Sequence, residues 1–233
     1  MTTQEPPTDP RLTIPEELLL LGWDDARGRN RSSQNVGALL GGALLLELDL
    51  LGHVHIDDGR VHPTEDATGQ GHLDRMLDEL RGSRRPRKVK AWVQRVGHRS
   101  WPRRVVLDRL VERGILRRDR RKFLGIVPYT RYPVIDREVT DRLRQHVADT
   151  LLQPEPVTVT RDAMLGALLA PAGGRLLRRL VPTDRRRDAL RRAKELSKGE
   201  GVSQEVAAAI DELNAAAIAA AASGAAVTSA SSG

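Results

Sequence analysis

Residues 36–51 read VGALLGGALLLELDLL and place apolar side chains on nearly every face of a helix. A helix that is apolar all round is buried on all sides, whereas a surface helix has a polar face. Gly37, Gly41 and Gly42 would each destabilise an exposed helix by roughly 1 kcal/mol relative to alanine, so we expect them to permit close packing against another backbone. Gly52 predicts a left-handed cap after the helix. The sequence therefore predicts a buried central helix.

Amphipathic segments on both sides of this run predict a mainly α fold. Thr13 and Glu16 have the spacing of a capping box and predict a first helix that ends at Gly22. Acidic pairs such as Glu16 and Glu17 stand at helix starts, where they favour the helix dipole. Further helices are expected at residues 71–80, 89–96, 102–113, 136–152, 161–169, 175–180, 184–196 and 204–222.

Two hairpins are expected on this helical scaffold. Residues 53–61 alternate about Asp57-Asp58-Gly59, and Asp-Gly is a strong signal for a two-residue turn. Residues 115–127 have apolar ends and a basic centre, so the second hairpin should carry its charge at the tip. We predict one domain from residue 12 to residue 222, mainly α around a buried central helix, with a protruding basic β-hairpin and a second short hairpin.

The ends of the chain and its composition bound the class of protein. Residues 1–11 are polar and proline-rich and residues 223–233 are small and polar, so both are predicted to be disordered. The 233 residues include no cysteine, which excludes disulfides, thiolate zinc sites and cysteine nucleophiles and fits a cytoplasmic protein. No apolar stretch reaches the length of a spanning helix, roughly 20 residues, so contact with a membrane would be peripheral.

Motifs of catalysis are missing from the sequence. We find no P-loop, no dinucleotide-binding glycine motif, no nucleophile elbow and no zinc-protease motif, and we expect no catalytic residue and no cofactor. His53, His55 and His62 lie near Asp57, but they lack the spacing of a metal site, so no metal is expected.

Charge is concentrated in one part of the chain. The segment from Arg81 to Arg131 has 18 basic and three acidic residues, a net charge of +15, whereas the remaining residues have a net charge of −8. Of the 38 basic residues 33 are arginine, which indicates a compositional bias, but a scattered bias would not leave the rest acidic. The segment predicts a face that binds a polyanion.

Two polyanions fit this segment. An anionic membrane surface attracts basic residues with about 1 kcal/mol each, and apolar residues beside them can enter the interface. Nucleic acid is the alternative, because the short helices within residues 89–113 followed by a basic hairpin look like a winged helix. Few aromatic residues stand among the cations, which makes nucleic acid the less favoured partner.

Several blocks together resemble the Golgi phosphoprotein 3 family. They are LTIPEELLLLG at residues 12–22, GALLLEL at residues 42–48, RLVERGIL at residues 109–116, and Phe123 after a polar turn. The resemblance extends from Leu12 to about Ala222. It implies a helical domain with a hydrophobic central helix and a protruding hairpin for membrane contact and self-association. Eukaryotic members bind phosphatidylinositol 4-phosphate and adapt Golgi enzymes to retrograde vesicles.

The family's headgroup pocket, one Trp and three Arg, carries over in part. The resemblance puts Ser32 at the Trp position, Gly41 at the first Arg position, Ser100 beside Arg99 at the next, and Arg103 at the last. It implies headgroup binding by Arg99, Arg103 and Arg104, membrane contact by the hairpin residues Arg117, Arg118, Arg120, Arg121, Lys122 and Phe123, and further headgroup contacts from Arg27, Arg29 and Arg31. Guanidinium groups suit this role because they bind phosphate oxygens bidentately.

We expect a non-enzymatic peripheral membrane protein with anionic phospholipid or phosphoinositide headgroups as partners. A homo-oligomer formed through the hairpin and the tails of membrane-protein cargo are further expected partners. The protein should lie on the cytoplasmic face of a membrane, at the Golgi only if it is eukaryotic. The preference for arginine over lysine and the short tails suggest a bacterial-type member.

Overall fold

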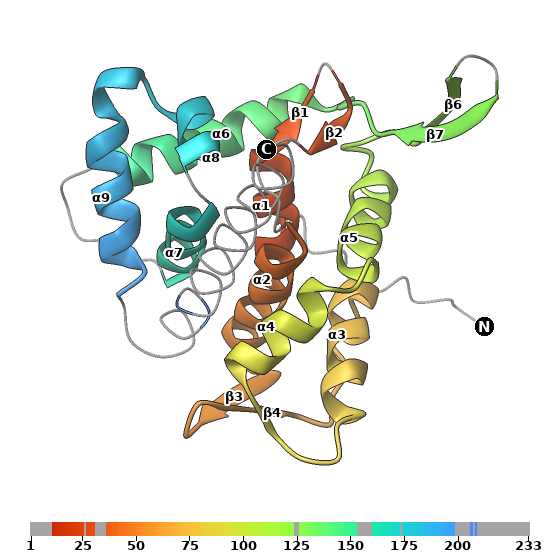
Figure 1. The fold of residues 1–233 in the computed structure, drawn as a ribbon, viewed down its shortest axis with the longest axis vertical. Helices are drawn as coiled ribbons and strands as arrows, with labels where there is room; N and C mark the ends of the chain where they lie inside the picture. Colours follow the sequence, from red (N-terminus) through yellow and green to blue (C-terminus); the bar gives the residue numbers. More distant parts are fainter. Residues whose placement is uncertain are drawn as a thin grey trace, which may run out of the picture.

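Helix α2 (Val36–Leu50) runs through the centre of the molecule (Figure 1). The computed structural model describes residues 11–25, 27–30, 36–123, 126–152, 160–172 and 174–198, together with Val206 and Ala208. Leu44, Leu45 and Leu46 of α2 are completely buried. Helices α1, α3, α4, α5 and α7 all contact α2. The predicted buried central helix is confirmed.

The helices around α2 account for most of the described chain, as predicted. They are α1 (Ile14–Leu21), α3 (Gly71–Arg81), α4 (Val89–Gly97), α5 (Trp101–Glu112), α6 (Arg137–Leu152), α7 (Thr160–Ala172), α8 (Gly174–Leu180), the 3₁₀ turn η1 (Thr183–Arg185) and α9 (Arg186–Leu196). The predicted disorder of residues 1–11 and 223–233 and the helix at residues 204–222 lie outside the described residues, apart from Arg11, Val206 and Ala208.

Glycines let α2 and α4 approach each other closely. A Cβ atom on Gly37 would lie 2.3 Å from the carbonyl oxygen of Gly97 in α4, and one on Gly41 would lie 3.2 Å from Val96 Cγ1. The expected close packing at these glycines is therefore present. Gly52 ends α2 with φ +75°, so the predicted left-handed cap is also confirmed.

Short strands form three small antiparallel sheets in the described chain. They are β1 (Trp23–Asp24) with β2 (Arg29–Asn30), β3 (Val54–Asp57) with β4 (Arg60–Pro63) and β5 (Arg87–Lys88), and β6 (Asp119–Phe123) with β7 (Val127–Arg131). Asp58 and Gly59 both have positive φ in the β3–β4 turn, as a two-residue hairpin turn requires. The pairing of β5 with β4 and the β1–β2 ribbon, which the sequence showed only as a polar turn, were not predicted.

Charged side chains in the interior join α1 to its neighbours. Glu47 of α2 is 4% exposed and accepts a hydrogen bond from the backbone N–H of Ile14 at 2.6 Å. Arg161 of α7 donates to both carboxylate oxygens of Glu47 at 3.1 Å and to Glu17 Oε2 at 3.2 Å. It also donates to the carbonyl oxygen of Leu12. One guanidinium group thus binds two carboxylates and the start of α1.

A second part of this network lies on the other side of α1. Glu16 is fully buried and accepts hydrogen bonds from the backbone N–H of Thr13 at 2.7 Å and from its hydroxyl at 2.9 Å. Arg113 lies 3.3 Å from the same carboxylate, and His72 Nε2 lies 3.1 Å from Thr13 Oγ1. The capping box is confirmed. Glu16 and Glu17 do more than favour the helix dipole, because both pair with arginines inside the fold.

Burial changes the protonation of two members of this network. Desolvation raises the pKa of Glu17 to about 7, although the charge of Arg161 acts in the opposite direction. Desolvation, assisted by the charge of Arg109, lowers the pKa of His72 to about 4. Near neutral pH the interior therefore holds a neutral imidazole, and Glu17 titrates close to that pH.

Candidate functional site

The hairpin of β6 and β7 projects away from the helices (Figure 1). Its register runs from Asp119 opposite Arg131 to Phe123 opposite Val127. Directly paired residues of an antiparallel hairpin share a face, and successive residues alternate between faces. The two strands therefore present both of their faces beyond the helical body.

Three cations of the hairpin are exposed and form no ion pair within the described chain. They are Arg117, just before β6, and Arg120 and Lys122 on β6. Arg120 lies opposite Thr130 and Lys122 opposite Pro128, so these two cations share one face of the hairpin. An exposed cation without an acidic partner in the protein is available to bind an external anion.

Two other predicted hairpin cations contact acidic side chains of the protein itself. Arg118 pairs with Asp108 of α5 and lies over the ring of Tyr132, with 5.9 Å between its guanidinium carbon and the ring centroid. Arg121 Nε lies 2.8 Å from Asp119 Oδ2, and this hydrogen bond raises the pKa of the Arg121 side chain. Arg118 therefore fixes the base of the hairpin against α5, whereas the charge of Arg121 is partly compensated.

Exposed apolar side chains gather on the same hairpin. Ile126 in the turn is 81% exposed and Tyr129 on β7 is 40% exposed. Ile135, a few residues after β7, is 52% exposed. We call Arg117, Arg120, Lys122, Ile126 and Tyr129 the hairpin patch.

The prediction that the tip carries the charge is wrong. The sequence placed Ile115 and Leu116 in the first strand, but both are buried in the core, and Leu116 forms a bridge with Val134. The first strand consequently starts at Asp119, so the cations line the strand and Ile126 occupies the turn. The backbone of Phe123 ends β6, while its side chain and Leu124 lie outside the description.

The predicted headgroup arginines lie at the other end of α5. Arg99 is in the connection between α4 and α5, and Arg103 and Arg104 are in the first turn of α5; all three are exposed. No acidic residue occupies that turn, where the helix dipole already favours an anion. We call these three residues the α5 arginines.

The structure does not merge the α5 arginines with the hairpin patch. The 12 residues of α5 separate them by about 18 Å along the helix axis. Arg118 bridges part of this distance, because its partner Asp108 stands one helical turn after Arg104. In Figure 1 the hairpin and α5 occupy the same side of the molecule.

Positions carried over from the family's pocket are less favourable. Gly41 is buried where α2 packs on Val96, so this position offers no side chain to a ligand. Ser100 is exposed and precedes α5, and Ser32 lies outside the described residues.

The additional contacts predicted from the loop before α2 are only partly described. Arg27 is exposed and pairs with Asp24 at 3.3 Å, and its carbonyl oxygen accepts a hydrogen bond from Arg131 Nε at 3.1 Å. This bond places Arg27 at the base of the hairpin. The backbone of Arg29 lies in β2, while its side chain and the whole of Arg31 are outside the described residues.

No group of three or more histidine or acidic side chains among the described residues could hold a metal ion. His55 and His62 stack on each other, with ring centroids 4.9 Å apart, as cross-strand neighbours of β3 and β4. Among the residues that the structure describes, no helix is both long and apolar enough to cross a membrane.

Comparison with known proteins decides the family. The model of Golgi phosphoprotein 3 (GPP34) matches residues 14–213 of this chain. The chain belongs to the Golgi phosphoprotein 3 family. Vacuolar protein sorting-associated protein 74 of Eremothecium gossypii is 25% identical over 226 residues, which cover 81% of this chain and 68% of that relative. The resemblance stated from the sequence blocks is thus confirmed, while the suggestion of a bacterial-type member finds no support in these matches.

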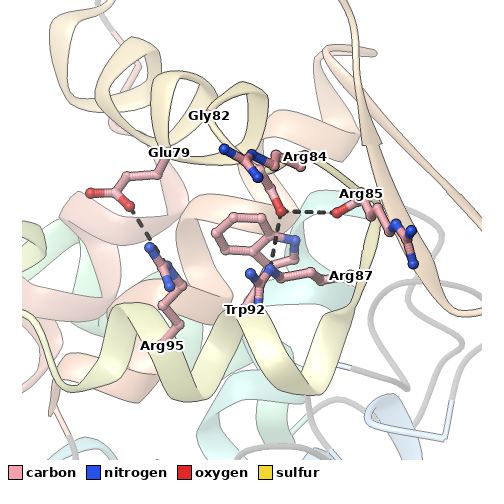
Figure 2. A pocket seen from close by; sticks show the side chains of 8 residues that line it. Glu79, Gly82, Arg84, Arg85, Arg87, Trp92 and Arg95 are labelled. Carbon is pink, nitrogen blue, oxygen red and sulfur yellow. Dashed lines mark hydrogen bonds and ion pairs between the residues drawn. The ribbon is translucent and has the colours of Figure 1, made fainter.

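Sequence reasoning missed one basic site in this member of the Golgi phosphoprotein 3 family. Arg84, Arg85 and Arg87 entered only into the total charge, but the structure gathers them around a cavity with Trp92 and Arg95 (Figure 2). The dense run of cations between two predicted helices was the available signal.

Proposed function

We propose that this protein is a non-enzymatic peripheral membrane protein that docks on anionic phospholipid headgroups through the hairpin patch. The observation that carries the proposal is the combination of unpaired cations with the exposed Ile126 on one projecting hairpin. Cations suit the phosphate layer of a membrane and an isoleucine suits the acyl boundary beneath it.

The alternation along β6 supports insertion by the turn. Arg120 and Lys122 occupy one face of the hairpin, and Arg121 occupies the other. When Ile126 enters the interface, Arg120, Arg121 and Lys122 of β6 lie nearest the headgroups, whereas Arg117 lies farther away, at the base of the hairpin. The two unpaired cations of β6, Arg120 and Lys122, contribute about 1 kcal/mol each, and the sum of about 2 kcal/mol corresponds to about thirtyfold in binding.

The α5 arginines extend this surface in the proposal. They lie on the same side of the molecule as the hairpin, so a membrane that touches both adds up to three further charge contacts (Figure 1). The family resemblance implies recognition of phosphatidylinositol 4-phosphate. Because Ser32 and Gly41 replace the Trp and the first Arg of the family's pocket, we propose docking on anionic phospholipids in general, with that lipid as one of them.

An adaptor role completes the proposal. The related protein's name refers to vacuolar protein sorting, and the family resemblance implies self-association through the hairpin and binding of membrane-protein tails. Association of several copies would multiply weak membrane contacts. We propose the cytoplasmic face of a membrane as the site of action, the Golgi if the source is eukaryotic.

Vesicle co-sedimentation at about 0.15 M salt, where the screening length is about 8 Å, tests the proposal. Neutral vesicles, vesicles with phosphatidylserine and vesicles with added phosphatidylinositol 4-phosphate are compared, each with and without excess duplex DNA. We expect binding to both anionic vesicle types that persists in the presence of DNA. Failure to bind any vesicle, together with tight binding of DNA, would overturn the proposal in favour of the winged-helix alternative.

A further inference from the structure

A cavity of about 580 Å³ opens between the end of α3 and the start of α4. Its wall includes Arg84, Arg85 and Arg87 of the α3–α4 connection, and Trp92 and Arg95 of α4. In Figure 1 this connection lies at the opposite end of the long axis from the hairpin. The cavity is therefore separate from the hairpin patch, and it does not include the α5 arginines.

The charge of the cavity wall is strongly positive. Four arginines face it, and Glu79 is the one acidic residue among the described lining residues. Glu79 is already shared, because Arg95 lies 3.9 Å and Arg75 lies 3.8 Å from its carboxylate. Arg84 and Arg85 are exposed, and within the described chain no acidic side chain pairs with either. The wall thus offers guanidinium groups that the protein itself does not neutralise.

A buried donor without a partner points to a ligand in this cavity. Trp92 is 2% exposed, and its indole Nε1 has no hydrogen-bond partner in the structure. Figure 2 shows this nitrogen on the side of the ring that faces the loop of Arg84, Arg85 and Arg87. An unpaired buried N–H group destabilises a protein, and an oxygen acceptor placed in the cavity would satisfy it.

The loop that carries the arginines is held in place from several sides. Its end, β5, pairs with β4, and Arg60 donates to the carbonyl oxygen of Pro86 at 3.1 Å. Ser83 Oγ donates to the carbonyl oxygen of Arg85 at 2.9 Å and accepts a hydrogen bond from Arg87 Nε at 3.0 Å. Arg87 is therefore oriented through its Nε, while its terminal nitrogens stay available. A site held before its ligand arrives loses less entropy on binding.

We propose that this cavity binds a phosphate-bearing anion, with Arg84 and Arg87 on the phosphate oxygens and Trp92 Nε1 as a further donor. Guanidinium groups match phosphate geometry through paired hydrogen bonds, and a second phosphate fits the number of cations and the size of the cavity. The phosphate can belong to a soluble compound or to a lipid headgroup, because both present the same oxygens.

Isothermal titration with sodium pyrophosphate and inorganic phosphate tests this site. We expect the wild-type protein to bind one pyrophosphate per chain and to bind it more tightly than phosphate. The double variant Arg84→Gln with Arg87→Gln should weaken pyrophosphate binding at least tenfold, and Trp92→Phe, which removes only the donor and a little volume, should weaken it about tenfold. The control Arg178→Gln with Arg187→Gln removes the same charge from α8 and α9 and should change nothing.

The double arginine variant also identifies the source of the phosphate. If it binds phosphoinositide vesicles as the wild type does but has lost pyrophosphate binding, the ligand is a soluble phosphate compound. If it loses both, the ligand is a headgroup. Absence of saturable pyrophosphate binding below millimolar concentration, or equal affinity in the wild type and both site variants, would overturn the proposal. Loss of vesicle binding through hairpin variants leaves this titration unaffected, so the two proposals fail separately.

Discussion

Arginines of the interior and arginines of the hairpin are of the same residue type but have opposite surroundings. Arg161 binds the carboxylates of Glu47 and Glu17 and a carbonyl oxygen inside the fold, so its charge is compensated by the protein itself. Arg117 and Arg120 stand on the surface, and no acidic residue of the described chain pairs with them. Charge that is matched inside the molecule stabilises the fold, whereas charge left unmatched on a projecting element is available to a partner.

This contrast separates two effects that a charge count combines. Removing an interior arginine should change stability, because it leaves buried carboxylates without a counter-ion. Removing a hairpin cation should change binding and leave stability nearly unaltered, because solvent already surrounds it. Each variant below tests one side of this difference.

The largest effect is expected from Arg161→Met. The side chain of similar length leaves Glu47 and Glu17 buried together without their cation, and we expect a loss of about 3–5 kcal/mol in the free energy of unfolding. Urea denaturation followed by circular dichroism measures it. The control is Arg142→Met, which removes an exposed ion pair with Glu138 and should cost less than about 0.5 kcal/mol. Similar losses in the two variants would show that Arg161 does not hold the interior charges.

The next effect appears in the pH dependence of stability. Glu17 has a pKa raised to about 7 in the folded state. Its contribution to the free energy of unfolding is therefore fully present below about pH 4.5 and is lost as the pH rises through 7. His72 has a pKa lowered to about 4, so its contribution is fully present above about pH 6.5 and is lost as the pH falls through 4. The two contributions have opposite slopes, each amounting to about 3 kcal/mol.

Replacing either residue should therefore tilt the stability curve. Relative to the wild type, Glu17→Gln should become more stable as the pH rises from 4.5 to 7, and His72→Gln should become less stable as the pH rises from 4 to 6.5. Urea midpoints at half-unit pH steps provide the comparison. Parallel curves for the wild type and both variants would contradict the assigned protonation states.

A smaller loss should follow from Gly37→Ala. The added methyl group would meet the carbonyl oxygen of Gly97, so α2 and α4 would have to separate, at a cost of about 1–3 kcal/mol. Gly71→Ala at the start of α3 adds the same group where no atom lies within 4 Å, and it should be neutral or slightly stabilising. Thermal denaturation of Gly37→Ala and Gly71→Ala measures this difference. Equal melting temperatures would show that the stability of the fold does not depend on the close contact between α2 and α4.

Features encoded by neighbouring residues could be predicted from the sequence. The run of residues 36–51, the Asp-Gly turn before Arg60 and the cap at Gly52 each depend on side chains a few positions apart. The hairpin register could not be predicted in this way, because Ile115 and Leu116 are apolar for the core rather than for a strand. Periodicity does not distinguish these two uses of an apolar residue.

The interior ion pairs and the arginine cavity also could not be predicted from local sequence. Glu47 and Arg161 are 114 residues apart, so their pairing follows from the packing of α2 on α7 and leaves no local pattern. The cavity depends on β5 pairing with β4, which turns the arginine loop toward Trp92. The missing hydrogen-bond partner of the buried Trp92 Nε1 can be recognised only in the folded structure.

Charge reversal on the hairpin tests the central claim most directly, and it should have the smallest effect on the fold. The triple variant Arg117→Glu, Arg120→Glu and Lys122→Glu is compared with Arg178→Glu, Arg179→Glu and Arg187→Glu, which changes the net charge equally on exposed residues of α8 and α9. Both should unfold within about 0.5 kcal/mol of the wild type. We predict that the hairpin variant no longer sediments with phosphatidylserine vesicles while the control still does. Equal binding by the two variants would contradict docking through the hairpin.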